Sequence, residues 1–170
     1  AGYAIKLRDF YAGPTIADMA LAAKAQTAET SPIARGHQLL LPMQKRYFEQ
    51  AFPNPNHYNQ ALMLRVPPGL DIDAWRKAVA AVIEAHDALR LRFKLNDTTW
   101  SAFYGDAGDD TVVTLDLASV SIEDRKMRST AAINALQGSL DIRTGRTFRS
   151  LYLDFGCEPG RMLLIAHHLV

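Results

Sequence analysis

The chain has 170 residues, 48% of them hydrophobic, which is enough for one packed domain or for one lobe of a larger enzyme. Its 19 basic and 18 acidic side chains give a formal net charge of +1, so the overall charge favours neither nucleic acid nor an anionic membrane as a partner. The single cysteine, Cys157, excludes an internal disulfide and a cysteine-rich metal site, and because no apolar run approaches the roughly 20 residues of a membrane helix, we expect a cytoplasmic protein.

Residues 1–26 predict a short helical segment rather than an independent domain. A Gly-Pro pair precedes Thr15, which is a favourable N-cap for a helix that we expect to reach about Gln26. The apolar stripe of this helix is weak and needs a larger body to cover it. Residues 27–37 are small and polar and contain proline and glycine, which is typical of a linker.

From residue 38 onward the pattern is that of a folded domain. Pro42 is a favourable first-turn residue for a helix that ends near Gln50. Asp71 is expected to cap the most strongly amphipathic helix of the chain, which places His86 on its apolar side.

Strands account for most of the remaining sequence. Alternation or short apolar runs predict them at residues 58–66, 89–93, 100–104, 112–117, 147–155 and 162–170. Ser121 is expected to cap a further helix that runs to about Leu136, and the last two strands should form a hairpin around the turn at Glu158-Pro159-Gly160. The order of helices and strands predicts an α/β sandwich, in which helices cover a sheet.

The last predicted strand delivers two adjacent histidines, His167 and His168. Successive side chains of a strand point to opposite faces, so one imidazole is expected to pack inside the domain and the other to face a cleft. An imidazole in a cleft can accept or donate a proton near neutral pH because its unperturbed pKa is about 6.5. The alternative is a pair of histidines that is satisfied by hydrogen bonds within the core.

Four stretches resemble, in this order, the opening motifs of the condensation-domain superfamily of nonribosomal peptide synthetases. They are Leu41–Phe48, Asn59–Leu62, Ala85–Phe93 and His167–Val170. Within the superfamily they are most similar to epimerization domains, because Ala85-His86-Asp87 stands where condensation domains proper usually have Arg-His-Glu. Residues 2–20 resemble the last third of a carrier (thiolation) domain, which precedes such domains in this family.

The resemblance implies a chloramphenicol-acetyltransferase-like α/β sandwich of which this chain is the N-terminal lobe, preceded by a short helical carrier-domain remnant. The implied domains are residues 1–26 for the C-terminal part of the carrier domain, 27–37 for the linker and 38–170 for the lobe. The implied partners are the C-terminal lobe of the same domain and an aminoacyl or peptidyl carrier domain. The carrier's 4′-phosphopantetheine is the implied cofactor, with its attachment serine upstream of Ala1, and no metal is expected.

The same resemblance implies an amino-acid epimerase, an isomerase that interconverts L and D configuration at the α-carbon of a carrier-bound thioester during the biosynthesis of a peptide antibiotic or similar product. His168 maps onto the catalytic histidine of the family, which works with a glutamate of the second lobe, so this fragment alone is expected to be inactive. His167 and Arg90 map onto residues that support the active site. Arg90 matches an arginine that forms a salt bridge with the aspartate of the histidine motif in relatives.

Two other functions are compatible with the sequence. A condensation domain would use the same histidine beside an attacking amine to form a peptide bond between two carrier-bound substrates. A catalytically silent domain of the same fold would instead recruit a partner protein. Chiral analysis of the carrier-bound product distinguishes epimerization from condensation. Binding of a partner that persists without His168 would favour the silent domain.

The remaining polar residues have less specific interpretations. His86 is expected to be packed in the core, and Arg90 is expected to share one strand face with Arg92. The pair Asp109-Asp110 lacks the further ligands of a metal site. The arginines that could steer an acidic carrier surface, with plain solubility as the alternative, are Arg143, Arg146 and Arg149.

Overall fold

The computed structural model describes residues 2–4, 15–26, 33–106 and 111–170, and the chain divides into two compact units, Ala1–Pro32 and Ile33–Val170. The first unit contains β1 (Gly2–Ala4), α2 (Ile16–Ala22) and β2 (Lys24–Gln26), and its two strands pair in an antiparallel arrangement. Thr15 is the N-cap of α2, as predicted, and its hydroxyl accepts a hydrogen bond from the backbone N–H of Asp18 at 3.2 Å.

The prediction that the first helix continues to Gln26 is wrong. The helix ends at Ala22, and Ala23 has an extended backbone with φ −66° and ψ 125°. Residues 24–26 instead satisfy their backbone groups by pairing with β1, a long-range interaction that helical periodicity cannot report. Residues 5–14, part of the carrier-like stretch, and residues 27–32 of the predicted linker lie outside the described residues.

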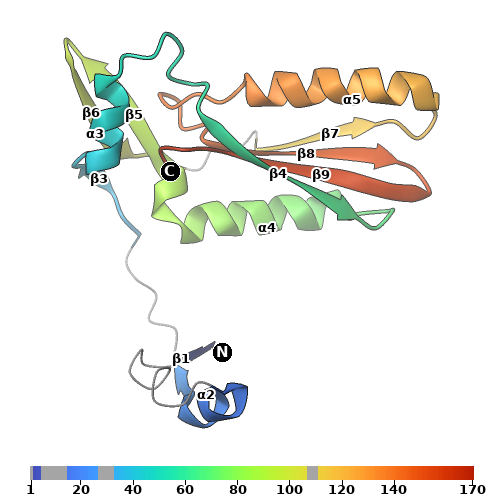
Figure 1. Cartoon of the computed structure of the whole chain (residues 1–170), viewed down its shortest axis with the longest axis horizontal. Coiled ribbons are helices and arrows are strands. Elements are labelled where there is room, and N and C mark those ends of the chain that lie inside the picture. Colours follow the sequence, from blue (N-terminus) through green and yellow to red (C-terminus); the bar gives the residue numbers. More distant parts are fainter. Residues whose placement is uncertain (1, 5–14, 27–32, 107–110) are drawn as a thin grey trace. The chain divides into compact units, whose positions relative to one another are not determined.

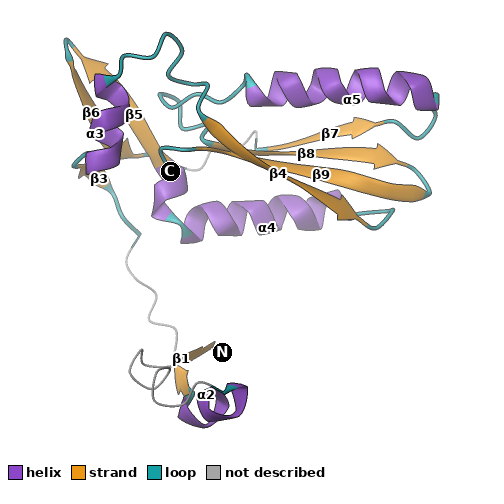
Figure 2. Cartoon of the chain, viewed as in Figure 1, coloured by secondary structure: helices purple, strands orange, loops and turns teal. Residues whose placement is uncertain are grey.

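The second unit contains two sheets with their covering helices (Figures 1 and 2). One sheet has the order β4 (Asn59–Val66), β9 (Glu158–His167), β8 (Phe148–Phe155) and β7 (Val112–Asp116), with β7 parallel to β8 and the other pairs antiparallel. The other is antiparallel and has the order β3 (Gly36–Gln38), β6 (Thr99–Tyr104) and β5 (Leu91–Asn96). The helices are α3 (Pro42–Glu49), α4 (Ile72–Ala85), α5 (Ile122–Gln137) and the 3₁₀ helix η1 (Asp87–Arg90).

The mixed α/β architecture agrees with the predicted class, and most predicted elements are present. Gly36 and His37, which the sequence assigns to the linker, pair with β6 and therefore belong to a sheet. Within the described part of the chain, no helix combines the length and apolar character that crossing a membrane requires.

Helices α4 and α5 lie on opposite faces of the four-stranded sheet (Figure 1). On the α4 face, the indole N–H of Trp75 donates a hydrogen bond to the Ser150 hydroxyl of β8 at 3.1 Å. On the α5 face lies an apolar core whose buried members are Leu117, Leu136, Leu140, Leu151, Leu153, Leu163 and Ile165. Both helices begin at predicted caps, since the Asp71 carboxylate accepts from the backbone at the start of α4 and the Ser121 hydroxyl does so at the start of α5.

A second apolar core joins the three-stranded sheet to α3 and to the end of the chain. Its buried members are Tyr47, Leu91, Phe93, Ala102, Ile142 and Leu169. The end of β9 accordingly lies beside α3 and β5 in Figure 1. Because Leu169 is buried in this core, the backbone on either side of it is held in place, and this fixes the position of His168.

The strand predicted at residues 89–93 begins later than expected. Asp87–Arg90 forms the 3₁₀ helix η1, and β5 starts at Leu91. Arg90 therefore does not share a strand face with Arg92, and that prediction is wrong. The 3₁₀ turn is stabilised from outside the segment, because the Thr147 hydroxyl donates a hydrogen bond to the Leu89 carbonyl at 3.1 Å.

The turn of the final hairpin also differs from the prediction. The chain reverses at Gly156-Cys157, where Gly156 has φ +73°, and Glu158 pairs with Phe155 as the first residue of β9. Pro159 is tolerated inside β9 because the pairing shifts register opposite it, between Leu153 and Phe155.

Gly160 of β9 has no room for a side chain. A Cβ atom there would lie 2.5 Å from the Tyr152 ring and 2.8 Å from the Leu153 carbonyl oxygen. We expect Gly160→Ala to lower the free energy of unfolding by about 1–3 kcal/mol, measured by urea denaturation. Gly138→Ala is the matched control, since its Cβ would meet nothing closer than 3.4 Å, and the expectation is wrong if both variants unfold at the same urea concentration.

Candidate active site around the histidine pair

The two histidines occupy different environments at the end of β9. His167 is the last residue of the strand and is completely buried, whereas His168 follows it and is exposed. The expected division, with one imidazole packed inside and the other facing outward, is therefore observed. Strand alternation contributes to this division, and so does the turn that follows β9, in which Leu169 is buried and the Val170 N–H donates to the His167 carbonyl at 3.1 Å.

His167 links the end of β9 to the loop between α3 and β4. Its Nε2 lies 2.9 Å from the Pro55 carbonyl oxygen, and its Nδ1 accepts a hydrogen bond from the Leu169 N–H at 3.3 Å. A carbonyl can only accept and an N–H can only donate, so this pattern requires the neutral tautomer with hydrogen on Nε2. Tyr47 donates its hydroxyl to the same Pro55 carbonyl at 2.9 Å.

Burial lowers the pKa of His167 below 6.5. The hydrogen bond to Pro55 raises the pKa and opposes this effect, while the nearby His168 lowers it further. Proton uptake would also place a second N–H against the Leu169 N–H, so geometry and desolvation both favour the neutral ring. His167 is thus suited to hold the loop and is unsuited to exchange protons with a substrate.

His168 is held through its backbone while its ring remains available. Its N–H donates to the Tyr58 carbonyl at 2.7 Å, and its ring lies against the Tyr58 ring with centroids 4.9 Å apart. Among the described residues, no hydrogen bond is made by either ring nitrogen of His168. The ring lines a cavity of about 370 Å³, whose other walls include Leu41, Met43 and Tyr47.

Gln44 is a second buried tether of this loop. Its side chain is 3% exposed, its amide N–H donates to the Leu169 carbonyl at 2.9 Å, and its amide oxygen accepts from the Leu41 N–H at 2.9 Å. Neither Gln44 nor Tyr58 was predicted from the sequence as a residue of the site. A glutamine three residues into a helix that bonds back to the N-cap backbone is half of a capping box, and this signal was available in the sequence. The hydrogen bond to Leu169 joins residues 125 positions apart, so it could not be predicted from the sequence.

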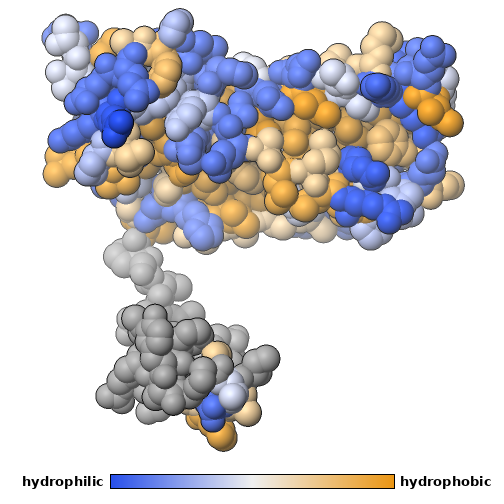
Figure 3. Space-filling view, in the orientation of Figure 1, coloured by the Kyte–Doolittle hydropathy of each residue, from blue (hydrophilic) through white to orange (hydrophobic). Residues whose placement is uncertain are grey.

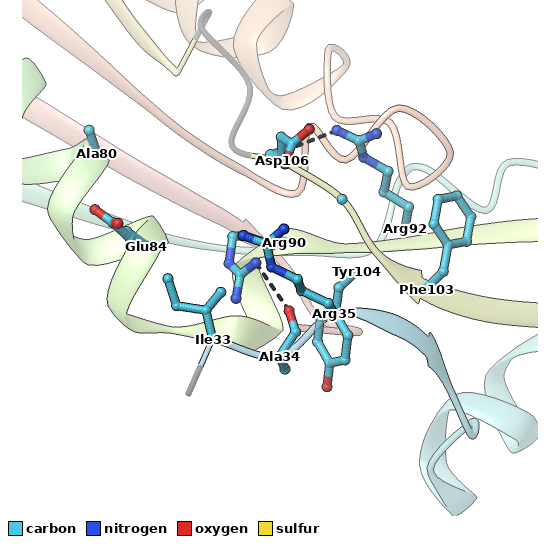
Figure 4. Close-up of a pocket in the computed structure, with 11 residues that line it drawn as sticks. Ile33, Ala34, Arg35, Ala80, Glu84, Arg90, Arg92, Phe103, Tyr104 and Asp106 are labelled. Atoms are coloured by element: carbon cyan, nitrogen blue, oxygen red, sulfur yellow. Dashed lines mark hydrogen bonds between the residues drawn. The ribbon is translucent and has the colours of Figure 1, made fainter. Parts of the chain in front are cut away.

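Arg90 lies in a different cavity, of about 630 Å³, that does not include the histidine pair. Figure 4 shows its guanidinium group beside that of Arg35, and Glu84 of α4 lines the same cavity. Arg90 is 8% exposed, forms an ion pair with Asp87 and donates to the Ala34 carbonyl at 3.4 Å. Its Nε has no hydrogen-bond partner among the described residues, so this buried guanidinium retains capacity for another acceptor.

Arg90 is nevertheless connected to the histidine pair through the backbone. Thr147 donates its hydroxyl to the Leu89 carbonyl at 3.1 Å and accepts, with its own carbonyl, the His167 N–H at 2.7 Å. We assign the candidate site to the smaller of these two cavities because it contains the His168 ring, which has no hydrogen-bond partner among the described residues and is held in place by buried tethers.

The other polar candidates do not join this site. His86 was expected in the core, but it is the exposed C-cap of α4, because the helix ends one residue before it, so that prediction is wrong. Arg149 is 6% exposed and donates to the Ser139 hydroxyl at 2.6 Å, so it is too buried to steer an acidic carrier surface. Arg146 is exposed, and the Arg143 guanidinium lies over the Trp100 ring. Asp109 and Asp110 lie outside the described residues, and among those that are described no three metal-ligating side chains converge.

Comparison with known proteins identifies the family. The model of the family described as "Condensation domain" matches residues 34–170. A linear gramicidin synthase protein of Brevibacillus parabrevis is 37% identical over 178 residues, covering 100% of this chain, and surfactin synthase subunit 2 of Bacillus subtilis (strain 168) is 31% identical over 175 residues, covering 99%. The chain belongs to the condensation-domain family of nonribosomal peptide synthetases.

Solved structures support the fold. The epimerization domain from the third module of tyrocidine synthetase B is similar with a TM-score of 0.76 and 26% identity, over 86% of this chain and 32% of that one. The starter condensation domain of rhizomide synthetase, at 20% identity and a TM-score of 0.67, shows the same fold over 79% of this chain and 31% of that one. The second unit has the chloramphenicol-acetyltransferase-like fold of the N-terminal lobe of these domains. The chain spans only 3% of the gramicidin synthase protein and 5% of the surfactin synthase protein.

The buried histidine predicts a pH dependence of stability. Because the pKa of His167 in the folded state lies below 6.5, the unfolded chain takes up a proton first as the pH falls. Stability should therefore be complete above about pH 6.5 and decrease as the pH falls from there towards the pKa of the folded state, with a slope of at most about 1.4 kcal/mol per pH unit. Urea unfolding at a series of pH values measures this slope.

Two comparisons make this prediction specific to His167. The His86→Gln variant should retain the slope, because the side chain at position 86 is exposed. In NMR spectra of the folded wild-type chain the His167 ring should titrate below 6.5, and a midpoint at or above that value would contradict the assignment without any need for a variant.

Proposed function

We propose that this chain is part of an epimerization domain, in which His168 exchanges the α-proton of an aminoacyl or peptidyl thioester bound to a carrier domain. The observation that carries the proposal is the His168 ring, which lines a cavity with both nitrogens unpaired among the described residues while its backbone is fixed. The likeness to the epimerization domain of tyrocidine synthetase B and the Ala85-His86-Asp87 sequence support epimerization over condensation.

The chemistry requires a base on one face of the α-carbon and an acid on the other. The ring of His168 would take the α-proton as its neutral form and become an imidazolium, which leaves an enolate at the thioester. Return of a proton to the opposite face gives the other configuration, and return to the original face restores the substrate. By the family resemblance the second group is a glutamate of the C-terminal lobe, and without it we expect this fragment to be inactive.

The cavity beside His168 is compatible with the arm that carries such a substrate. Its volume of about 370 Å³ lies in the range of small-molecule sites, and Leu41 and Met43 give it an apolar wall. The 4′-phosphopantetheine of a carrier domain would supply the thioester that acidifies the α-carbon. The residues of this chain would hold the arm, exclude water and fix the base.

In this proposal His167 and Arg90 support the site without touching the substrate. His167 holds the loop through Pro55 and Leu169. Arg90, with its Nε unpaired within the described residues, would accept the aspartate that follows the histidines in relatives as its ion-pair partner. Both roles depend on contacts within the domain and not on proton transfer.

Condensation is the second candidate. The matching family model is named for it, and the rhizomide synthetase domain of the same fold is a condensation domain. In that reaction His168 would assist an amine that attacks the thioester, so the same geometry would serve. A silent domain that recruits a partner would need no proton-exchanging ring at all.

The test is His168→Ala in the complete carrier-plus-epimerization protein, with the carrier loaded with the L-substrate. We expect the rate of D-product formation to fall by roughly 10²–10⁴-fold, the usual contribution of a general base, while folding is retained because the side chain is exposed. Chiral chromatography of the released substrate measures the rate. His86→Ala is the matched control and should leave it unchanged.

The other outcomes identify the alternatives. An unchanged rate of D-product formation in His168→Ala would sink the proposal. Peptide-bond formation that depends on His168 without any D-product would favour condensation. Binding of a partner that survives the substitution, in a protein that shows neither reaction, would favour the silent domain.

Gln44 offers a separate test of how the base is positioned. Gln44→Met keeps the side-chain volume but removes the hydrogen bonds to Leu169 and Leu41. We expect kcat for epimerization to fall roughly 10–100-fold with little change in KM, because the cavity wall is preserved while the loop bearing His168 loosens. A fall in thermal stability with kcat unchanged would show that Gln44 acts on folding alone.

A further inference from the structure

Two arginines face each other across adjacent strands at the end of the sheet remote from the histidines. Arg65 of β4 and Arg161 of β9 are direct partners in the antiparallel register, so their side chains stand on the same face. Like charges in this arrangement destabilise a sheet. Among the described residues neither arginine has an ion pair, and Arg161 donates only to the carbonyls of Pro159, at 3.4 Å, and Gly160, at 3.1 Å.

The first turns of α5 bring further positive charge to the same place. Arg125 and Lys126 line, with Arg65 and Arg161, a cavity of about 380 Å³. The cavity lies near the N-terminal end of α5, where the helix dipole adds positive potential. The acidic residues of that first turn, Glu123 and Asp124, are not among the residues that line it.

The guanidinium group of Arg125 is already bound by neighbouring groups of the protein. It forms an ion pair with Glu158 at 2.7 Å, lies 5.4 Å over the Phe155 ring and donates to carbonyls of the loop before α5, including that of Leu117. Glu158 is the one carboxylate among the described lining residues, and Arg125 holds it. Arg65, Arg161 and Lys126 therefore line the same cavity, and none of the three has a carboxylate partner in the described part of the chain.

We propose that this cavity is a binding site for a phosphate-class oxyanion, either free or carried on a small molecule. The Arg65 guanidinium and the N–H groups of Arg161 that do not bind the Pro159 and Gly160 carbonyls can donate to tetrahedral oxygens. Lys126 adds a further positive charge, so the site can offset the double negative charge of a phosphate monoester at neutral pH. Exposed Ile122 and half-buried Pro159 also line the cavity and give it apolar surface against which an organic substituent could pack. In Figure 3 strongly hydrophilic side chains gather at this end of the sheet, next to the apolar surface over β4.

The site is separate from the candidate active site. Arg161 and His167 lie six residues apart on β9, which corresponds to roughly 20 Å along an extended strand. The cavity shares no lining residue with the one beside His168. Binding here is therefore independent of whether the domain epimerizes, condenses or does neither.

The test compares unfolding and binding of the full chain in inorganic phosphate and in sodium chloride at equal ionic strength and at about pH 7.5. We expect saturable binding of phosphate, measured by calorimetry, and a higher Tm at low millimolar phosphate than in chloride. Arg65→Gln and Arg161→Gln should each weaken the binding by about tenfold or more. Lys77→Gln, an exposed cation on α4, is the control and should bind phosphate like the wild type.

The Tm of the variants in chloride provides a second test, in which the substitution is expected to have the opposite effect to its effect on phosphate binding. Arg65→Gln removes the cross-strand repulsion, so its Tm without phosphate should be equal to or higher than that of the wild type. Adenosine monophosphate that binds more tightly than inorganic phosphate would identify an organic phosphate as the ligand, and equal affinity would identify the free anion. Non-saturable binding by the wild type, or equal binding by Arg65→Gln and the wild type, would overturn the proposal.

Discussion

The arrangement of the candidate site depends on the hydrogen bond between His167 and the Pro55 carbonyl. This 2.9 Å contact joins residues 112 positions apart in the sequence and ties the end of the central strand β9 to the loop that follows α3. Because the same ring accepts the Leu169 N–H, it also fixes the first turn beyond the strand. His168 is exposed and yet held in place because its neighbours on both sides are buried and hydrogen-bonded.

The pair of histidines thus divides two tasks that one ring could not combine. A ring that anchors a buried loop must remain neutral, and burial achieves this by lowering the pKa of His167. A ring that exchanges protons must instead have free nitrogens at the edge of a cavity, as His168 has within the described part of the chain. Gln44 contributes to this separation of roles, because its amide N–H donates to the Leu169 carbonyl and so holds the loop without a hydrogen bond from the His168 ring.

Local signals in the sequence predicted much of the fold but little of how the site is tethered. Caps such as Asp71 and Ser121 act within three residues, so the starts of α4 and α5 could be predicted. The 3₁₀ helix at Asp87–Arg90 could not be predicted locally, because it depends on a hydrogen bond from Thr147, far along the chain. The final turn is formed at Gly156, which has a positive φ, whereas the sequence placed it at the nearby Pro159-Gly160 pair. Strand alternation predicted that one of the two histidines is buried, but not which one, and the hydrogen bond of His167 to Pro55 requires the tertiary structure.

The two ends of β9 show opposite solutions to the problem of placing polar groups on a sheet. At the His167 end every buried ring nitrogen has a partner, and the strand gains a rigid loop from it. At the Arg161 end two like charges, those of Arg65 and Arg161, stand directly opposite each other on adjacent strands, an arrangement that destabilises a sheet. No contact among the described residues explains this pair, whereas the proposed oxyanion site does. An oxyanion between the guanidinium groups would convert the repulsion into two charge-assisted contacts.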